Sequence, residues 1–346
     1  MKNDQLTREQ QYREKEQHNQ ENQENQASQA KTEENRTSQL KNKLAEHKKK
    51  IILILLPLVV LGVILAIFYE REGTMAYEGG TYEGEIRGFK PHGEGTWLHP
   101  DGDRKDGRWK DGQLHGRGTV TLRDGTHYEG QLEFGLMHGQ GKIIRPDGTI
   151  YEGEFFEGLA HGRGETVYPD GSTYRGQYRH GQKHGLGVYN IAGGVTYEGE
   201  FKDGSLHGRG VWTHPDGQVY EGEFADDMFH GEGVLTGPEG MSYEGQFKEK
   251  QFHGEGKFTF ADGTTYEGEF VDGKFEGEGK MDYADGSVYE GQWKRGLRHG
   301  SGTMTYADGT VYEGEWKESQ YHGEGKMTFP GGGSLEGTFE DGNFVE

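Results

Sequence analysis

The stretch YEGEFKDGSLHGRG, residues 197–210, decides the fold of most of this chain. It places four glycines between and within two short runs in which aromatic and charged residues alternate. Asp203-Gly204 separates the two runs, and an Asp-Gly pair between alternating runs is a strong hairpin signal because both residues tolerate positive φ. The stretch therefore predicts two short antiparallel strands joined by a tight turn.

The same pattern recurs every 23 residues from Tyr82 to Ser334 without insertion or deletion. This makes eleven full units, and a partial twelfth begins at Leu335. Positions 1 to 23 are counted here from the first residue of each unit, which is usually Tyr. A second Asp-Gly pair stands at positions 20 and 21 of most units, as in Asp216-Gly217. Two turns per unit predict two strands per unit, so one repeating hairpin accounts for residues 82–346.

Alternation along each strand predicts that the two faces of this sheet differ. Tyr197, Gly199 and Phe201 fall on one face, and Glu198 and Glu200 fall on the other. Neighbouring rings can lie on the bare backbone of glycine, and such contacts offset the entropy that glycine loses in a strand. We therefore predict an all-β repeat fold, an elongated single antiparallel layer of hairpins.

The aromatic face is the candidate binding surface, because a single layer leaves its rings without an opposing layer. We expect glycines to satisfy some of the rings and several others to be open to a protein, glycan or lipid ligand. The two ends of the sheet, at 75–82 and 335–346, offer edges for strand pairing, which leaves a homodimer open. The candidate residues are Tyr151, Phe155, Tyr197, Phe201, Trp212, Tyr220, Phe224, Tyr243, Phe247, Tyr289, Trp293, Tyr312 and Trp316.

Three repeated features suggest chemistry but are better explained by structure. Histidine stands at position 11 of ten units, yet equivalent residues about 10 Å apart are too far from one another to share one metal ion. We expect each His to close a turn through backbone or a nearby Tyr, with a response to mild acid as an alternative. The Gly-x-Gly pairs lack the Lys-Ser/Thr of a phosphate loop. Glutamates at positions 2 and 4 indicate a solvated face, with weak calcium binding as an alternative. We predict no enzyme, metal site or cofactor.

The first 68 residues form two further segments. Residues 1–50 are rich in Gln, Asn, Glu and Lys, which predicts a disordered or weakly helical tail. Residues 51–68, IILILLPLVVLGVILAIF, carry no charge, and as a helix they span roughly 27 Å, close to the hydrocarbon thickness of a membrane. We predict a transmembrane helix here and a short linker over 69–81. A cleaved signal peptide is the alternative, which the long polar prefix disfavours.

Charge sets the expected orientation and excludes some partners. Six basic residues lie in the fifteen positions before the apolar span and one in the fifteen after it. The positive-inside rule therefore predicts a single-pass protein of the cell membrane with a cytoplasmic N-terminus and the repeats on the exterior side. The chain has a formal net charge of −21, which argues against binding of nucleic acid. It has no Cys, which excludes disulfides and thiolate chemistry.

The pattern Y-x-G-x-(W/F)-x-x-G-x-x-H-G-x-G resembles the MORN repeat (membrane occupation and recognition nexus). Residues 151–164, YEGEFFEGLAHGRG, and 289–302, YEGQWKRGLRHGSG, match it closely, and the resemblance covers residues 82–346. The departures are Lys105 and Leu335 at position 1, Phe89, Asp227, Lys250 and Ser319 at position 8, and Glu276 at position 11.

The resemblance implies a non-enzymatic, membrane-anchored scaffold that presents a repeat sheet to a protein or a cell-surface ligand. One alternative is recognition of membrane lipid, either of phosphoinositides or through bridging calcium. Another is a role similar to the accessory repeats of phosphatidylinositol phosphate kinases, although no kinase-like segment accompanies these repeats. Junctophilin-type relatives place their transmembrane helix after the repeats, and the reversed order here argues against a junctional role.

Overall fold

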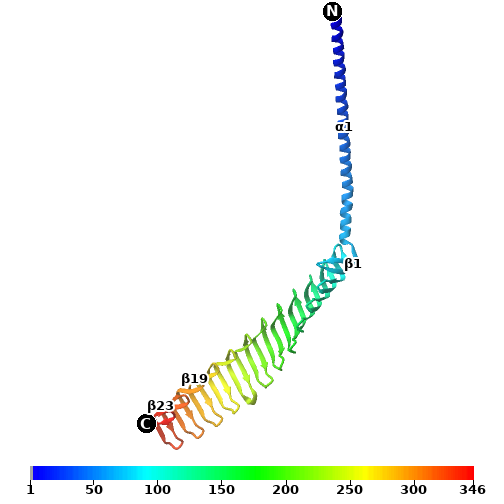
Figure 1. The fold of residues 1–346 in the computed structure, drawn as a ribbon. Coiled ribbons are helices and arrows are strands. Elements are labelled where there is room, and N and C mark those ends of the chain that lie inside the picture. Colours follow the sequence, from blue (N-terminus) through cyan, green and yellow to red (C-terminus); the bar gives the residue numbers. More distant parts are fainter. Residues whose placement is uncertain (1–2) are drawn as a thin grey trace. The chain divides into compact units, whose positions relative to one another are not determined.

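The computed structural model describes residues 3–346 (Figure 1). It contains one long helix, α1 (Asn3–Phe68), and one open sheet of 25 strands. The chain divides into two compact units, one with α1 and residues 86–89 and the other with most of the sheet. A single turn of 3₁₀-helix, η1 (Pro238–Gly240), interrupts one connection between strands.

Helix α1 includes most of the segment that the sequence predicts to be a tail. Of the two states predicted for residues 1–50, disordered or weakly helical, residues 3–50 adopt the helical one, while residues 1–2 lie outside the described residues. The segment has no Gly or Pro and is rich in Glu, Gln and Lys, which have high helix propensity. Residues 27–50 are exposed, so packing does not stabilise this part of the helix. Helix propensity and local hydrogen bonds stabilise it, such as the bond that Thr32 Oγ1 donates to the Ser28 carbonyl.

The apolar residues 51–68 form the last part of α1, and all of them are exposed. An 18-residue window of this helix has a mean hydropathy of 3.4. Pro57 lies inside the helix, as is tolerated in membrane helices. By length and composition this part of α1 is able to cross a membrane, a property that it shares with signal sequences.

The sheet is a single antiparallel layer in which each strand pairs with the next one in sequence (Figure 1). The predicted all-β layer of hairpins is therefore confirmed. The strands are β1 Glu70–Tyr77, β2 Gly80–Arg87, β3 Lys90–Leu98, β4 Arg104–Lys110, β5 Gln113–Thr121, β6 His127–Glu133, β7 Leu136–Ile144, β8 Ile150–Phe156, β9 Leu159–Val167, β10 Thr173–Arg179, β11 Gln182–Asn190, β12 Thr196–Lys202, β13 Ser205–Thr213, β14 Val219–Ala225, β15 Met228–Thr236, β16 Ser242–Lys248, β17 Gln251–Thr259, β18 Thr265–Val271, β19 Lys274–Asp282, β20 Val288–Lys294, β21 Leu297–Thr305, β22 Val311–Lys317, β23 Gln320–Thr328, β24 Ser334–Glu340 and β25 Asn343–Phe344.

Residues 69–81 are not a linker. Most of them form strand β1, which pairs with β2 through a turn at Glu78-Gly79, where both φ angles are positive. The stretch EREGTMAY lacks the Tyr-x-Gly pattern of the repeats, so the sequence gives no repeat signal for this strand. The sheet therefore begins one strand before the first repeat unit.

The two turns of each unit have different chemistry. At positions 7 and 8 both residues adopt positive φ in every unit but the first, as in Asp203 (50°) and Gly204 (97°). At positions 20 and 21 the glycine does so while an aspartate before it does not, as in Gly217 (95°), and Glu239 is the exception with a φ of 62°. The aspartate beside it instead accepts a hydrogen bond from the backbone two residues on: Gln218 N donates to Asp216 Oδ1 at 2.9 Å. This bond is the main cause that lowers the pKa of the Asp216 carboxyl.

A bulge interrupts the hairpin within each unit. In the pairing of β12 with β13, Gly199 lies opposite Gly210 while Phe201 lies opposite Leu206, so the second strand carries two extra residues. Gly208 within the bulge has a φ of 61°, a value that favours glycine. The Glu200 carboxylate spans the bulge and accepts a hydrogen bond from Arg209 N at 3.2 Å. Glu85, Gln131, Glu154 and Gln292 make the same bond in their own units. The side chain at position 4 therefore accepts a backbone hydrogen bond in addition to its place on the charged face.

Candidate binding surfaces of the sheet

The position-1 tyrosines form the centre of the core. Tyr197 is 0% exposed, and its ring covers Gly210, where an added Cβ would lie 2.5 Å from both Cε2 and the hydroxyl oxygen. The hydroxyl donates to the carbonyl of Glu200 at 2.8 Å, with the His207 carbonyl at 3.4 Å. The predicted ring-on-glycine contact is thus confirmed, and burial raises the pKa of these phenols, that of Tyr243 to about 12.

The position-5 rings join the tyrosines into one continuous row. Phe201 meets Tyr197 of its own unit edge-on at 5.1 Å between ring centroids, and Tyr174 of the preceding unit at 4.9 Å. Phe224 continues this pattern toward the next unit. Where position 5 is Trp, its indole also donates to a position-14 carbonyl, as from Trp293 to Gly279 at 3.1 Å.

These contacts correct the expected binding face. Of the thirteen candidate residues, twelve are at most 5% exposed: Tyr151, Phe155, Tyr197, Phe201, Tyr220, Phe224, Tyr243, Phe247, Tyr289, Trp293, Tyr312 and Trp316. They are core residues, because glycine lies beneath them and further side chains lie over them, so they are not open to a ligand. Trp212, at position 16, is half-buried. Its role in binding stays a prediction.

Position 10 supplies the side chains that cover the tyrosines. Phe229 stacks on Tyr220 with 3.9 Å between centroids, and Phe275 stacks on Tyr266 at the same distance. Phe229 and Phe275 are half-buried, so this outer layer holds rings that a ligand is able to touch. The sequence pattern offers one signal for position 10, which is not among the predicted site residues: this residue lies opposite position 5 across the tight turn.

Two cations replace apolar residues at position 10. Lys183 Nζ lies 3.6 Å from the ring centroid of Tyr189 and 5.4 Å from that of Tyr174. Burial lowers the pKa of the Lys183 ammonium group. Arg298 lies 4.4 Å over the Trp316 ring and donates to the Ser319 carbonyl at 3.1 Å. The aromatic face thus accommodates positive charge in two units.

The opposite, charged face carries a shallow groove whose floor is glycine. Its lining comes from positions 2, 3, 4, 13, 14 and 15, so glycines at positions 3 and 14 lie between two rows of side chains. We call this feature the glycine groove. It holds about 1010 Å³ over residues 278–337 and about 480 Å³ over residues 209–245. Further stretches follow residues 106–152 and 140–186.

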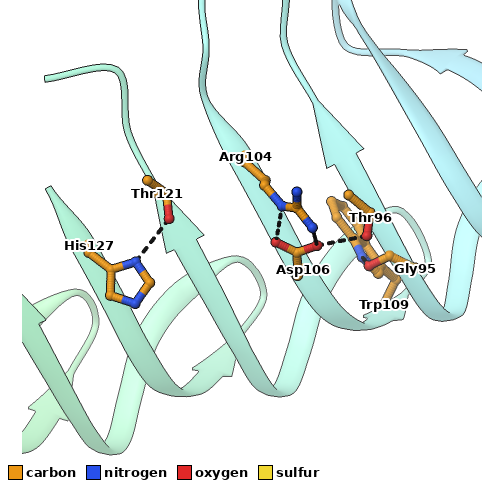
Figure 2. Close-up of polar contacts among 7 residues, drawn as sticks. All are labelled: Gly95, Thr96, Arg104, Asp106, Trp109, Thr121 and His127. Carbon is orange, nitrogen blue, oxygen red and sulfur yellow. Dashed lines mark hydrogen bonds and ion pairs between the residues drawn. The ribbon is translucent and has the colours of Figure 1, made fainter. Parts of the chain in front are cut away.

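Near the start of the glycine groove the acidic side chains are already paired. Asp106 accepts hydrogen bonds from Arg104 Nε at 2.6 Å and from Thr96 Oγ1 at 2.7 Å (Figure 2). The bond from Arg104 is the largest of the causes that hold the pKa of the Asp106 carboxyl below its ordinary value. In the next hairpin, Thr121 and His127 share a hydrogen bond of 2.9 Å (Figure 2). This end of the groove is therefore mixed in charge.

The position-11 histidines do not close turns through their rings as expected. The tyrosine hydroxyls lie near the backbone carbonyls of these residues instead, as with Tyr220 and His230 at 3.3 Å. The rings pack beside the tight turns of the next unit, such as His138 against Phe156 at 5.4 Å. In the described part of the chain, the Nδ1 atoms of His115 and His253 are buried without a hydrogen-bond partner. No group of three His, Asp or Glu suited to a metal ion occurs among the same residues.

The geometry of one repeated hairpin agrees with the family comparison. The MORN repeat matches residues 82–104, 106–127, 128–150, 151–173, 174–195, 197–219, 220–242, 243–265, 266–288, 289–311 and 312–334. The chain belongs to the MORN repeat family. MORN repeats indicate a role in binding or as a scaffold. No curated protein matches the chain significantly.

Two residues that depart from the MORN pattern are accommodated by local contacts. Lys105 stands in place of the first Tyr, and its Nζ lies 4.7 Å over the Trp97 ring. Glu276 stands in place of the His, and its carboxylate accepts a hydrogen bond from Arg295 N at 2.8 Å. Neither change breaks the strand register of its unit.

Several solved structures align with much of the MORN array at low similarity. The TCP10 domain of Danio rerio CPAP, solved in complex with a peptide of Danio rerio STIL, is 16% identical over 70% of this chain and 97% of that chain, with a TM-score of 0.35. The SAS-4 (dCPAP) TCP domain of Drosophila melanogaster is 12% identical over 64% and 90% of the two chains, with a TM-score of 0.15. Virginiamycin B lyase from Staphylococcus aureus is 12% identical over 78% and 88%, with a TM-score of 0.14. Such low TM-scores support no conclusion about what this chain binds.

Proposed function

We propose that this chain is a non-enzymatic, single-pass membrane scaffold that displays its MORN sheet to protein partners. The observation that carries the proposal is an apolar helical segment, residues 51–68, which is exposed along its whole length and is followed in the sequence by a sheet built from one repeated hairpin. A soluble helix would bury such a segment against a core. The hydrocarbon of a membrane is the environment that suits it.

The charges flanking the span support an orientation for the scaffold. Lys48, Lys49 and Lys50 precede the apolar segment directly, and only Arg71 follows it closely. The positive-inside rule then keeps residues 1–50 in the cytoplasm and displays the sheet on the exterior side. On this arrangement the anchor fixes one end of the chain and the repeats offer equivalent positions at regular spacing.

Because the tyrosine row is buried, we place binding on two other surfaces of the sheet. One is the half-buried layer at positions 10 and 16, with Trp212 and Phe229 as examples, and the other is the glycine groove. Both repeat along the sheet, which suits an extended partner better than a small molecule. The proposal of a scaffold thus rests on a long surface, since no unique cluster of reactive side chains stands apart from the repeat within residues 69–346.

Membrane extraction at alkaline pH tests the anchor. We expect the wild-type chain to stay with the membrane pellet, and the variant Leu58→Arg with Leu61→Arg to move to the soluble fraction. Each Arg near the centre of a span costs about 2.5–3.5 kcal/mol on insertion scales. The matched control is Leu40→Arg with Leu44→Arg, two exposed leucines in the polar part of α1, and this variant should stay with the membrane. Release of the wild-type chain, or a mature N-terminus after residue 66, would contradict the proposal.

A further inference from the structure

A line of glycines crosses the sheet perpendicular to its strands. Strand register pairs each position-3 glycine with the position-14 glycines on both sides, as in Gly199–Gly210, Gly210–Gly222 and Gly222–Gly233. On the aromatic face, Tyr197 fills the space beside Gly199 and Gly210. On the charged face the same glycines have no side chain, so backbone is the floor of the glycine groove.

The first wall of the groove is only partly neutralised. It consists of positions 2 and 15, which lie opposite one another on neighbouring strands, as Lys326 and Glu336 do. Lys326 Nζ is 2.8 Å from the Glu336 carboxylate, which is also the main cause that raises the pKa of the Lys326 ammonium group. Over residues 220–337 position 15 is Lys only at Lys257, Lys280 and Lys326, so the wall keeps a net negative charge. The position-2 residues of this stretch are Glu221, Glu244, Glu267, Glu290, Glu313 and Glu336.

The second wall, at positions 4 and 13, changes sign along the sheet. Position 13 is Arg in three of the first six units, at Arg117, Arg163 and Arg209, and the other three have Glu94, Gln140 and Leu186. In the later units it is Glu at Glu232, Glu255, Glu278 and Glu324, with Ser301 between the last two. Within the described chain none of these four carboxylates is in an ion pair. Two of them accept hydrogen bonds from neutral groups instead: Gln292 Nε2 donates to Glu278 at 3.1 Å and Thr338 Oγ1 donates to Glu324 at 3.0 Å.

The spacing of these carboxylates matches an extended polypeptide. Position 13 recurs every second strand, and two strand spacings amount to about 9.4–9.8 Å. One turn of a polyproline II helix takes three residues and rises about 9.3 Å. Every third side chain of such a segment, laid along the groove, therefore faces Glu232, Glu255 and Glu278 in turn. Because that helix has no internal hydrogen bonds, its own backbone polar groups are free to meet the glycine floor.

We propose that the glycine groove over residues 220–337 binds an extended segment of a partner protein, in polyproline II conformation, with Lys or Arg at every third residue. Three carboxylates without ion pairs at regular spacing, Glu232, Glu255 and Glu278, attract such a segment, with Glu324 one unit beyond Ser301, and the net negative charge of the first wall adds to the attraction. The position-13 arginines of earlier units oppose it, which favours binding to the later units. This inference rests on the proposed scaffold function and names the class of partner.

Peptide binding to the full-length chain in detergent micelles tests the inference. The probe is a fluorescein-labelled peptide of Arg-Pro-Pro repeats, and its control has the same composition with all arginines in one block. Fluorescence anisotropy at physiological ionic strength should show about tenfold weaker binding of the block peptide, because only the spaced one pairs with several carboxylates at once. Equal affinity for the two peptides, or no binding of the spaced one, would overturn the proposal.

Two matched variants locate the binding site. Glu232→Gln, Glu255→Gln, Glu278→Gln and Glu324→Gln together should weaken binding of the spaced peptide about tenfold or more, since each surface ion pair contributes about 0.2–1 kcal/mol. The control variant removes as much charge at exposed positions outside the groove, through Glu249→Gln, Asp272→Asn and Glu318→Gln at turns and Glu340→Gln at the end of β24. It should bind within about twofold of wild type.

Other outcomes of the same series would reject the inference. Equal weakening by both variants would mean long-range attraction without a groove site. A wild-type dimer that dissociates on neutralising the four groove carboxylates would mean that a second copy of the chain occupies the groove. The peptide experiments do not depend on the membrane anchor. If the membrane extraction test fails, peptide binding is still measurable, and if peptide binding fails, the result of the membrane extraction still stands.

Discussion

At the scale of single residues, the position-14 glycine leaves no room for a side chain on the aromatic face. An added Cβ at Gly210 would lie 2.5 Å from the Tyr197 ring, which is fully buried and held by its hydroxyl. We predict that Gly210→Ala lowers the free energy of unfolding by about 1–3 kcal/mol, as overpacking does elsewhere. The measurement is denaturant unfolding followed by circular dichroism.

Gly331→Ala is the matched control for that substitution. Nothing lies within 4 Å of a Cβ at Gly331, and its φ is not in the positive region. Its free energy of unfolding should change by less than about 0.5 kcal/mol. If both substitutions cost the same, glycine would matter through general strand entropy and the ring contact would not be the cause.

Position 4 gives a second prediction at this scale. Gln stands there naturally in other units and accepts the same bond across the bulge, so Glu200→Gln should leave stability within about 0.5 kcal/mol of wild type. Glu200→Ala removes the acceptor of Arg209 N and should cost about 1 kcal/mol. Both values come from the same unfolding experiment. A loss on Glu200→Gln as large as that on Glu200→Ala would show that charge, and not the bulge bond, fixes this position.

Sequence alternation was sufficient to place these residues on their faces. Tyr197, Gly199 and Phe201 do share one face, as their spacing predicts. The depth of the rings was not predictable, because alternation assigns a face without saying what covers it. The bulge was also missed, since His207-Gly208-Arg209-Gly210 reads as continued alternation until the positive φ of Gly208 is known.

At the scale of elements, the first 68 residues depart most from expectation. The polar part of α1 has no apolar stripe, and the pattern of side chains therefore gives no helix signal. Its helical state reflects intrinsic propensity over a long run without Gly or Pro. Strand β1 was missed for a related reason, because it pairs with β2 but lacks the repeat motif.

Proline substitution tests the state of this helix. Proline in a helix interior costs about 3 kcal/mol, so Thr32→Pro should reduce the helical circular dichroism signal of the chain while Thr32→Ala leaves it unchanged. Because residues 27–50 are exposed, the unfolding midpoint of the sheet should be the same in both variants. Identical helical signals in the two variants would instead support the disordered tail that the composition predicts.

At the scale of the whole molecule, the buried tyrosines predict that the sheet loses stability at alkaline pH. Burial raises the pKa of five tyrosine hydroxyls to about 12, against an ordinary value of 10.0, and these residues are Tyr82, Tyr128, Tyr151, Tyr243 and Tyr312. Between these values the folded chain keeps protons that the unfolded chain loses, so stability is fully present below pH 10 and falls as the pH rises toward 12. Phenolate absorbance and far-ultraviolet circular dichroism should therefore change together. Phenolate that forms near pH 10 in an intact sheet would contradict this packing.

Repetition made the whole-molecule fold the easiest level to predict. One hairpin, seen in Tyr197 to Val219, repeats in register, and each unit needs only its neighbours for pairing. The candidate binding site was harder to predict from the sequence for the same reason. Nearly identical units hide the few positions that differ, such as Lys183 and Arg298 at position 10 and the change from Arg209 to Glu232 at position 13.

The most direct test of the anchored scaffold uses the absence of Cys from the chain. Ser38→Cys and Ser334→Cys each introduce one exposed thiol, the first before the apolar segment and the second at the start of β24. A membrane-impermeant maleimide applied to intact cells should label only the Ser334→Cys chain, and both chains should react after lysis. Labelling of the Ser38→Cys chain on intact cells, or of neither chain until lysis, would contradict a sheet displayed on the exterior side.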